Sequence, residues 1–164
     1  TSLDNRYEWE EAHLVDNNIN LLDDLAAAKS IKILNQLPEK PIAVIDEDQI
    51  DLVLRNLISN AIKFTPNNGL ITIGAQPNKN SWQIMVKDTG VGMDEKIIEN
   101  IFDDGKNTST YGTNNEKGTG LGLSLCHEMV VNNGGKIWVE SVPKRGSTFF
   151  FTVQRAGEQL KKAS

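Results

Sequence analysis

Hydrophobic residues return at helical spacing along residues 48–65, the most regular segment of the chain. The positions that share this spacing are Ile50, Val53, Leu54, Leu57, Ile58 and Ala61. A period of three to four residues is typical of an amphipathic helix that buries one side. Asp46 or Asp48 can cap the start of this helix, and Pro66 ends it.

The rest of the chain alternates between shorter helical patterns and strand patterns. Further helices are predicted over 16–29, with Asp16 as the cap, over 94–101 and over 120–132. Alternating apolar and polar residues predict strands over 31–37, 42–45, 70–76, 81–88, 136–142 and 147–154. Because most strands form hairpins with helices set between them, the predicted fold class is α+β. We expect a two-layer α/β sandwich, a mixed, mostly antiparallel sheet covered on one face by about three helices.

Length, charge and cysteine content narrow the possible classes of protein. The chain has 164 residues, of which 38% are hydrophobic, and this suits one globular domain. A net charge of −5 argues against nucleic acid as a partner. The single cysteine, Cys126, is expected to be a packed core residue, and its isolation favours a reducing, cytoplasmic compartment. His13 and His127 have no partners at zinc-ligand spacing, so no zinc site is expected.

A row of polar residues lies on another side of the predicted helix 48–65. Asn56, Asn60 and Lys63 stand at i, i+4 and i+7, so they share one face. Two carboxamides and an ammonium group can hold a hydrated magnesium ion and a polyphosphate. Taken alone, the row fits an ordinary solvated helix face better.

The segment "DTGVGM", residues 88–93, follows a predicted strand. Gly90 and Gly92 would let the backbone approach a flat ligand closely. Asp88 could accept a hydrogen bond from the exocyclic amine of adenine, a donor that guanine lacks at that position. A tight glycine turn with an aspartate cap explains the same residues equally well.

The segment "GTGLGLSL", residues 118–125, opens directly into a predicted helix. Free amide groups at a helix N-terminus form a site for phosphate. The glycine spacing is neither that of a P-loop nor that of a dinucleotide fingerprint. A flexible hinge before a helix is the alternative. The polar segment 103–118 before it is long enough to be a functional lid.

Together, these segments resemble the catalytic, ATP-binding domain of sensor histidine kinases. The chain is similar to that family in "LRNLISNAIKFTP" (the N box), "DTGVGM" (the G1 box), "IFDDG" (the F box), "GTGLGLSL" (the G2 box) and the closing strand "GSTFFFTV". The resemblance implies a kinase-like ATPase domain over 14–154. Residues 1–13 would be a lead-in from an upstream dimerisation region or linker, and 155–164 a C-terminal tail.

The resemblance also implies roles for individual residues. Asn60 would be the magnesium ligand with Asn56 nearby, and Lys63 would reach the phosphates. Asp88 would take the adenine amine, and Thr148 would support the adenine end through water. The residues that would line the remainder of the nucleotide site are Phe64, Gly90, Gly92, Met93, Phe102, Gly118, Thr119, Gly120, Leu121, Gly122 and Leu123.

One position separates kinases from ATPases within the wider superfamily. The ATPases carry a glutamate one turn before the magnesium asparagine, and this chain has Asn56 there. A carboxamide cannot act as a general base, so slow hydrolysis by water is expected. The chain departs from the family in the F box, which ends in Gly105, and has no phosphoacceptor histidine box.

The expected function is that of the ATP-binding catalytic domain of a protein-histidine kinase, with ATP and Mg²⁺ as cofactors. It would donate the γ-phosphoryl group to a histidine on its own upstream dimerisation domain, and a response regulator would receive the group by phosphorelay. The isolated domain is expected to be a cytoplasmic monomer. Its parent is expected to be a homodimer, which could be anchored in the inner membrane. The alternatives are a degenerate nucleotide-binding or protein-docking module and an ATPase of the same superfamily.

Overall fold

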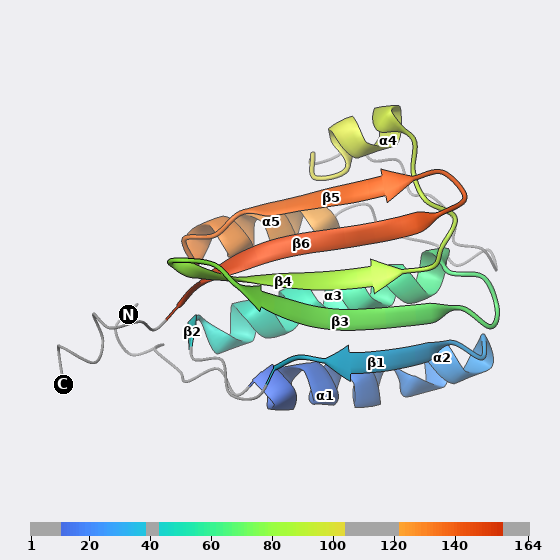
Figure 1. Ribbon diagram of the computed structural model, residues 1–164, viewed down its shortest axis with the longest axis horizontal. Coiled ribbons are helices and arrows are strands. Elements are labelled where there is room, and N and C mark those ends of the chain that lie inside the picture. The colour runs from blue at the N-terminus through green and yellow to red at the C-terminus, as the bar shows by residue number, and fades with distance from the viewer. Residues whose placement is uncertain (1–10, 39–42, 104–121, 156–164) are drawn as a thin grey trace, which may run out of the picture.

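A single sheet with helices over one face makes up the computed structural model, which describes residues 11–38, 43–103 and 122–155 (Figure 1). The helices are α1 Glu11–Leu21, α2 Asp23–Ala28, α3 Glu47–Phe64, α4 Glu95–Asn100 and α5 Gly122–Asn132. The strands are β1 Lys32–Gln36, β2 Ala43–Val44, β3 Leu70–Pro77, β4 Ser81–Asp88, β5 Ile137–Val142 and β6 Gly146–Arg155. These elements confirm the predicted strands and the predicted helices 48–65, 94–101 and 120–132, with small shifts at their ends.

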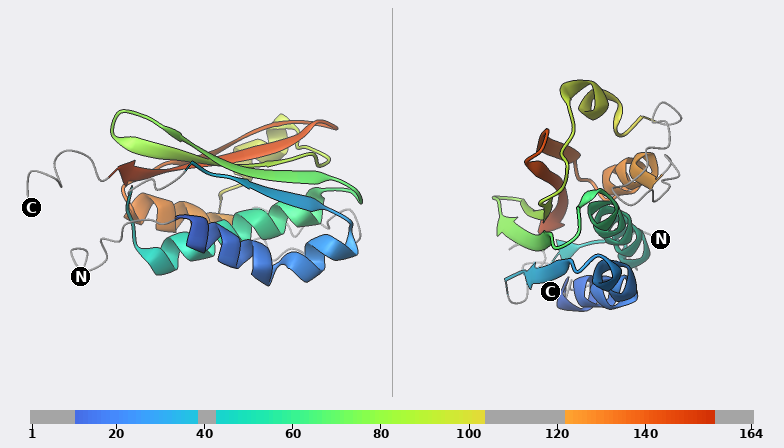
Figure 2. Two further views of the ribbon diagram at one scale, coloured as in Figure 1. Left: turned by 60° about the horizontal axis from the view of Figure 1, so that its bottom comes forward. Right: turned by 90° about the vertical axis from the view of Figure 1, so that its right-hand side faces the viewer.

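The six strands form a mixed sheet in the order β1-β3-β4-β6-β2, and β5 pairs with β6. Only the β1–β3 pairing is parallel among the described strands. Helices α1, α3 and α5 lie side by side on one face of the sheet, with α3 in the middle (Figure 2). The α+β two-layer sandwich predicted above is confirmed.

The core lies between α3 and the sheet. All six apolar positions predicted for the buried side of α3 are at most 4% exposed, and Ile62 joins them. The sheet contributes Ile71, Ile73, Ile84, Val86, Phe149 and Phe151. Cys126 on α5 is fully buried as expected, and burial raises the pKa of its thiol to about 12. Such a thiol is a packing residue rather than a nucleophile.

The start of the first helix differs from the prediction. Asp16 was expected to cap it, but α1 begins at Glu11 and Asp16 lies inside the helix. Its Oδ1 accepts a hydrogen bond of 2.8 Å from Asn35 Nδ2 on β1. Leu14 and Val15 are buried, so their packing extends the helix beyond the predicted start. The predicted helix 16–29 is also divided, because α2 begins anew at Asp23.

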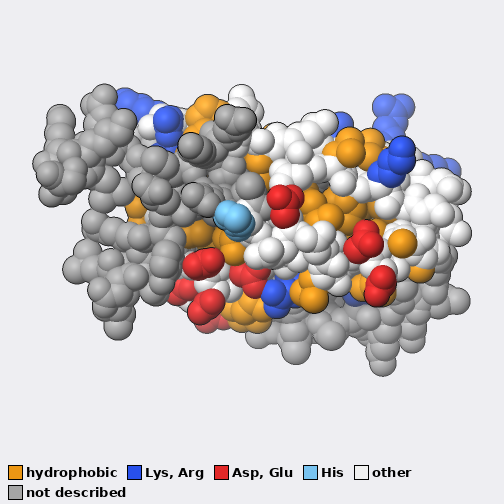
Figure 3. Space-filling model, turned by 90° about the horizontal axis from the view of Figure 1, so that it is seen from below, with side chains coloured by type: hydrophobic (Ala, Val, Ile, Leu, Met, Phe, Trp, Pro, Cys, Tyr) orange, Lys and Arg blue, Asp and Glu red, His pale blue; other side chains and the backbone are white. Residues whose placement is uncertain are grey.

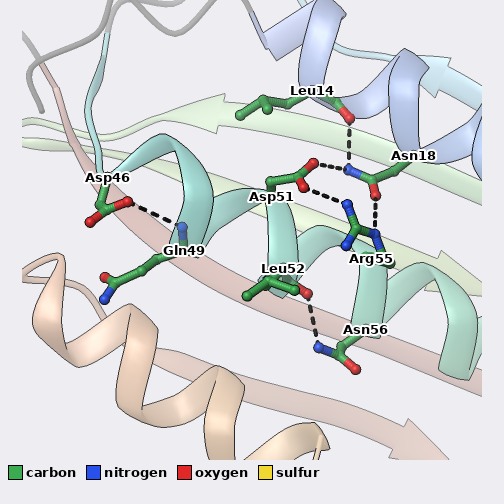
Figure 4. Close-up of polar contacts among 8 residues, drawn as sticks. All are labelled: Leu14, Asn18, Asp46, Gln49, Asp51, Leu52, Arg55 and Asn56. Atoms are coloured by element: carbon green, nitrogen blue, oxygen red, sulfur yellow. Dashed lines mark hydrogen bonds and ion pairs between the residues drawn. The ribbon is translucent and has the colours of Figure 1, made fainter.

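Polar contacts cap α3 and fix it against α1 (Figure 4). Asp46, rather than Asp48, caps α3 through a hydrogen bond of 3.2 Å from Gln49 N. On the side of α1, the buried Asn18 donates to Asp51 Oδ1 at 2.8 Å and accepts from Arg55 Nε at 3.2 Å. The paired Asp51 and Arg55 complete this link, so α3 has one defined position against α1.

The surface carries mixed charge. On the face that Figure 3 shows, the basic side chains of the described residues are isolated among acidic, polar and hydrophobic ones. A nucleic-acid-binding surface would need a continuous basic stripe, and this face offers none among those residues.

Truncating the centre of the core tests this packing. Leu54→Ala removes a side chain with no exposed area. We expect a loss of about 2–5 kcal/mol in the free energy of unfolding, because a cavity remains where the side chain packed. Urea denaturation measures the loss. Leu125→Ala on α5, where the side chain is 42% exposed, should change it by less than about 0.5 kcal/mol. Equal losses in the two variants would contradict the assigned core.

Candidate nucleotide-binding site

Asp88 is the buried acid of the candidate site. It ends β4, and its side chain lies on the helix-covered face of the sheet with Ile84 and Val86. Its Oδ1 accepts hydrogen bonds from Gly90 N at 2.8 Å and Ser147 N at 3.1 Å. Its Oδ2 has no hydrogen-bond partner among the described residues. An acceptor that is buried and unpaired is costly, so Oδ2 is suited to a ligand that donates a hydrogen bond.

Burial dominates the electrostatics of this carboxyl group. Loss of solvent raises the pKa of Asp88 above its ordinary value, and the hydrogen bonds from Gly90 and Ser147 lower it by a smaller amount. The net effect is a raised pKa. A perturbed carboxyl group beside a glycine-rich turn is typical of a functional site.

The turn after Asp88 packs directly on the end of α3. A Cβ on Gly90 would lie 2.4 Å from the carbonyl oxygen of Phe64, so a larger residue would clash with the backbone. Gly92 has a φ of +72°, and a Cβ there would lie 2.0 Å from the carbonyl oxygen of Val142. Between them, Val91 N donates to Phe64 O at 3.0 Å. Both predicted glycines are therefore needed for close approach of the backbone.

The three polar residues predicted on α3 lie along its second half, and all are partly exposed. Asn56 Nδ2 donates to Leu52 O at 2.9 Å, which directs Oδ1 away from the helix backbone (Figure 4). The side chain of Asn60 makes no hydrogen bond with the described residues. Lys63 Nζ lies 5.9 Å from the centre of the Phe64 ring. Two carboxamide oxygens and an ammonium group are thus carried by one helix that ends beside the Asp88 turn.

The start of α5 contacts the polar row of α3 at Asn56. A Cβ on Gly122 would lie 2.9 Å from Asn56 Oδ1, so the first turn of α5 abuts the middle of α3. Leu123 packs against the core. Free amides at a helix N-terminus attract anions, and the α5 start supplies them next to Asn56. The predicted phosphate-binding residues Gly118, Thr119, Gly120 and Leu121 lie outside the described residues.

Two predicted residues at the edge of the site pack on the core. The ring of Phe102 lies 6.2 Å from that of Phe149, edge to face, and 6.2 Å from that of His127. Met93 packs against the core, and its backbone N donates to Ser141 Oγ at 2.8 Å. Phe102 is therefore fixed where the predicted lid begins.

Thr148 is not where the sequence predicted it. In the pairing of β4 with β6, Thr148 lies opposite Lys87 and Ser147 lies opposite Asp88. Neighbouring residues of a strand point to opposite faces, so Thr148 faces away from Asp88. Ser147 is buried beside Asp88, and its hydroxyl lies 2.7 Å from Ser141 Oγ. The register therefore places Ser147, and not Thr148, beside the Asp88 carboxylate.

Sequence reasoning missed Ser147, although one signal was present. Phe149, Phe151 and Val153 are the buried residues of β6, and Ser147 is in phase with them. Counting back along the strand by two from these residues would have placed Ser147 on the inner face.

The described residues contain neither a cluster of metal-binding side chains nor a membrane-spanning helix. No group of three or more His, Cys, Asp and Glu side chains there could hold a metal ion. A magnesium ion in the site would rely on carboxamide oxygens, phosphate and water, and Asn56 and Asn60 fit this donor set. No described helix is long and apolar enough to cross a membrane.

Comparison with known proteins identifies the family. Residues 45–157 match the model of the histidine kinase-, DNA gyrase B- and HSP90-like ATPases. The chain belongs to this family of ATPases. Within the family it has the features of a sensor histidine kinase catalytic domain, as the relatives that follow indicate.

Two curated relatives are sensor kinases. The chain is 36% identical over 139 residues to the sensor histidine kinase WalK of Bacillus subtilis, covering 83% of this chain and 23% of WalK. It is 39% identical over 133 residues to the adaptive-response sensory kinase SasA of Crocosphaera subtropica, covering 80% of this chain and 34% of SasA. The chain therefore spans about a quarter to a third of the length of these relatives.

A solved structure supports the same fold and family. The catalytic domain of histidine kinase ThkA superposes with a TM-score of 0.77 at 29% identity. The match covers 89% of this chain and 93% of that domain. Most of the ThkA catalytic domain thus corresponds to most of this chain.

Asp88→Asn tests the electrostatic cost of the buried carboxylate. A raised pKa in the folded state means that the folded protein holds this proton more tightly than the unfolded chain. The stability that Asp88 contributes is present at low pH and is lost as pH rises through the folded pKa. We therefore expect Asp88→Asn to gain free energy of unfolding relative to the wild type between about pH 4 and neutral pH.

Urea denaturation across that pH range measures the difference. Asn keeps an oxygen that can accept from Gly90 N and Ser147 N, so the turn should be preserved. Glu128→Gln on α5, where the side chain is exposed, controls for the loss of one negative charge. A difference that is constant with pH, or that has the opposite sign, would contradict the raised pKa.

Proposed function

We propose that the chain is the catalytic domain of a two-component sensor histidine kinase. It binds ATP with Mg²⁺ and donates the γ-phosphoryl group to a histidine on an upstream dimerisation domain. The observation that carries the proposal is the buried Asp88 carboxylate, whose Oδ2 has no partner among the described residues, in a domain of the histidine kinase-, DNA gyrase B- and HSP90-like ATPase family.

Adenine is the base that fits this acid. Its exocyclic amine would donate to Asp88 Oδ2, the oxygen without a partner among the described residues. Gly90 and Gly92 let the turn pack closely on the backbone of Phe64 and Val142, and Ser147 lies beside Asp88 to complete a polar edge. Guanine presents a carbonyl oxygen where adenine presents its amine, so it would face the carboxylate with an unfavourable acceptor pair.

The phosphates would lie toward α3 and the start of α5. Asn60 is the proposed magnesium ligand, with Asn56 Oδ1 available nearby and Lys63 as the cation for phosphate. Mg²⁺, when bound, would neutralise charge that develops on the phosphoryl oxygens. The residues of this chain act by binding and orientation: they exclude water, align the phosphate chain and leave the nucleophile to another segment.

Asn56 favours transfer over hydrolysis. Its carboxamide donates to Leu52 O and cannot accept a proton from water near neutral pH. The described residues next to Asn56 on α3 include Arg55, whose guanidinium is engaged with Asp51 and Asn18. This stretch of α3 thus offers no general base for hydrolysis among the described residues.

A solved relative supports a response regulator as a partner. Histidine kinase ThkA has been solved in complex with the response regulator protein TrrA, and that structure superposes on 90% of this chain with a TM-score of 0.71. We propose that a response regulator likewise receives the phosphoryl group here. We also propose a cytoplasmic location, a homodimeric parent and a monomeric isolated domain.

Replacing Asp88 and Asn60 tests the adenine end and the magnesium end of the proposed site separately. Asp88→Asn should weaken binding of a non-hydrolysable ATP analogue about ten- to a hundred-fold with or without Mg²⁺. This is the loss expected for one charge-assisted hydrogen bond, about 1.5–3 kcal/mol. Asn60→Ala should weaken binding only when Mg²⁺ is present. Isothermal titration calorimetry measures both.

Thr148→Val is the matched control for the adenine end. Its side chain faces away from Asp88, so binding should be unchanged. An unchanged affinity in Asp88→Asn would remove Asp88 from the site. Equal effects of Asn60→Ala with and without Mg²⁺ would exclude Asn60 as the metal ligand.

Phosphoryl transfer tests the proposed reaction itself. The chain is mixed with [γ-³²P]ATP, Mg²⁺ and a separately purified upstream segment of the parent that carries its histidine. We expect acid-labile, base-stable label on that segment and little release of inorganic phosphate by the chain alone. Fast release of phosphate without labelling would favour an ATPase. Neither labelling nor release would favour a degenerate module.

A further inference from the structure

Lys29 is a buried lysine that lies outside the nucleotide site. It follows α2 as the C-cap of that helix and is only 4% exposed. Its side chain crosses to the last turn of α3, where Nζ donates to Ile62 O at 2.8 Å and to Lys63 O at 3.1 Å. Both acceptors are backbone carbonyls, so Lys29 is bonded to the helix end itself.

The end of α3 needs such a donor. The last carbonyls of a helix have no partner within the helix and carry partial negative charge. A buried ammonium group is costly unless it is paired. The helix carbonyls need a donor and the buried ammonium group needs acceptors. Both needs are met only when the end of α3 lies within hydrogen-bonding reach of Lys29, so the contact defines the position of the helix end.

A second bond ties the chain beyond α3 to the same lysine. Asn68 N, in the turn before β3, donates to Lys29 O at 2.8 Å. Lys29 therefore contacts the last turn of α3 through its side chain and the following turn through its carbonyl. The segment 62–68 is held from both sides by one residue.

This helix end is shared with the candidate site. Lys63 lies in this helix end, and Asn60 lies about one turn before it. The carbonyl oxygen of Phe64, the last residue of α3, accepts a hydrogen bond of 3.0 Å from Val91 N. Gly90 packs against the same Phe64 carbonyl. Any shift of the helix end would move the α3 row relative to the Asp88 turn.

We propose that Lys29 is a positioning residue for nucleotide binding, and this proposal rests on the proposed function. Lys29 touches neither base nor phosphate. It holds the C-terminal end of α3 in place. In this position Asn60 and Lys63 of the helix and the turn 88–92 can bind the same nucleotide. Removing its hydrogen bonds should loosen the Val91–Phe64 contact and weaken binding of the whole nucleotide.

Lys29→Met tests the proposal, because methionine keeps the length and apolar stem of lysine but removes the donors. Lys29→Arg keeps a charged donor and is the conservative variant. Val153→Ala is the matched control, since it opens a cavity in the core at the end of β6 far from Ser147. Thermal unfolding first establishes a temperature at which all variants are folded.

The primary readout is calorimetric titration with adenylyl-imidodiphosphate and Mg²⁺. We expect Lys29→Met to raise Kd about ten-fold, because small displacements of positioned groups are costly, and Lys29→Arg to recover part of the loss. Val153→Ala should bind the nucleotide with wild-type affinity, even if its Tm falls as much as the Tm of Lys29→Met. Wild-type affinity in a folded Lys29→Met would overturn the proposal and leave the proposed function standing.

Hydrogen exchange of the ligand-free protein gives a second readout. The Val91 amide should exchange faster in Lys29→Met and at the wild-type rate in Val153→Ala. Unchanged protection of Val91 in Lys29→Met would overturn the proposal. If Lys29→Met does not fold, Lys29→Leu, which also lacks a side-chain donor, takes its place with the same expectations. Absence of nucleotide binding by the wild type would overturn the proposed function, and the present proposal with it.

Discussion

The hydrogen bond from the Val91 amide to the Phe64 carbonyl joins the two halves of the candidate site. One half is α3, which carries Asn56, Asn60 and Lys63, and the other is the turn after Asp88. The turn can approach the helix end only because residue 90 is glycine. The core beneath holds both parts, since α3 packs on the inner face of β3, β4 and β6. Close packing therefore turns two segments distant in sequence into one surface.

The buried carboxylate shows how the fold supports function at a cost to stability. Burial raises the pKa of Asp88, so its charged form is disfavoured until a donor reaches Oδ2. Two backbone amides already hold Oδ1 and fix the direction of the group. In the proposed function this carboxylate is oriented before the ligand binds, and discrimination between adenine and guanine would come from pairing or failing to pair that oxygen.

Much of the fold followed from the sequence, because the amphipathic period of α3 and the alternation in the strands are local signals. The need for a cap at Asp46 or Asp48 was also readable, and so was the glycine-rich turn at residues 88–93. Contacts between segments that are distant in sequence could not be predicted in this way. Asp16 bonds to Asn35 instead of capping a helix, Ser147 takes the place expected for Thr148, and Lys29 reaches α3 from a segment far away in sequence. These depend on register and packing, which no single segment encodes.

Calorimetric titration of the unmodified domain with an ATP analogue and a GTP analogue, each with and without Mg²⁺, tests the central claim most directly. The account predicts binding of the adenine nucleotide that strengthens with Mg²⁺, and much weaker binding of the guanine nucleotide. Equal binding of the two, or none of either, would contradict the assignment of the Asp88 turn and α3 as an ATP site.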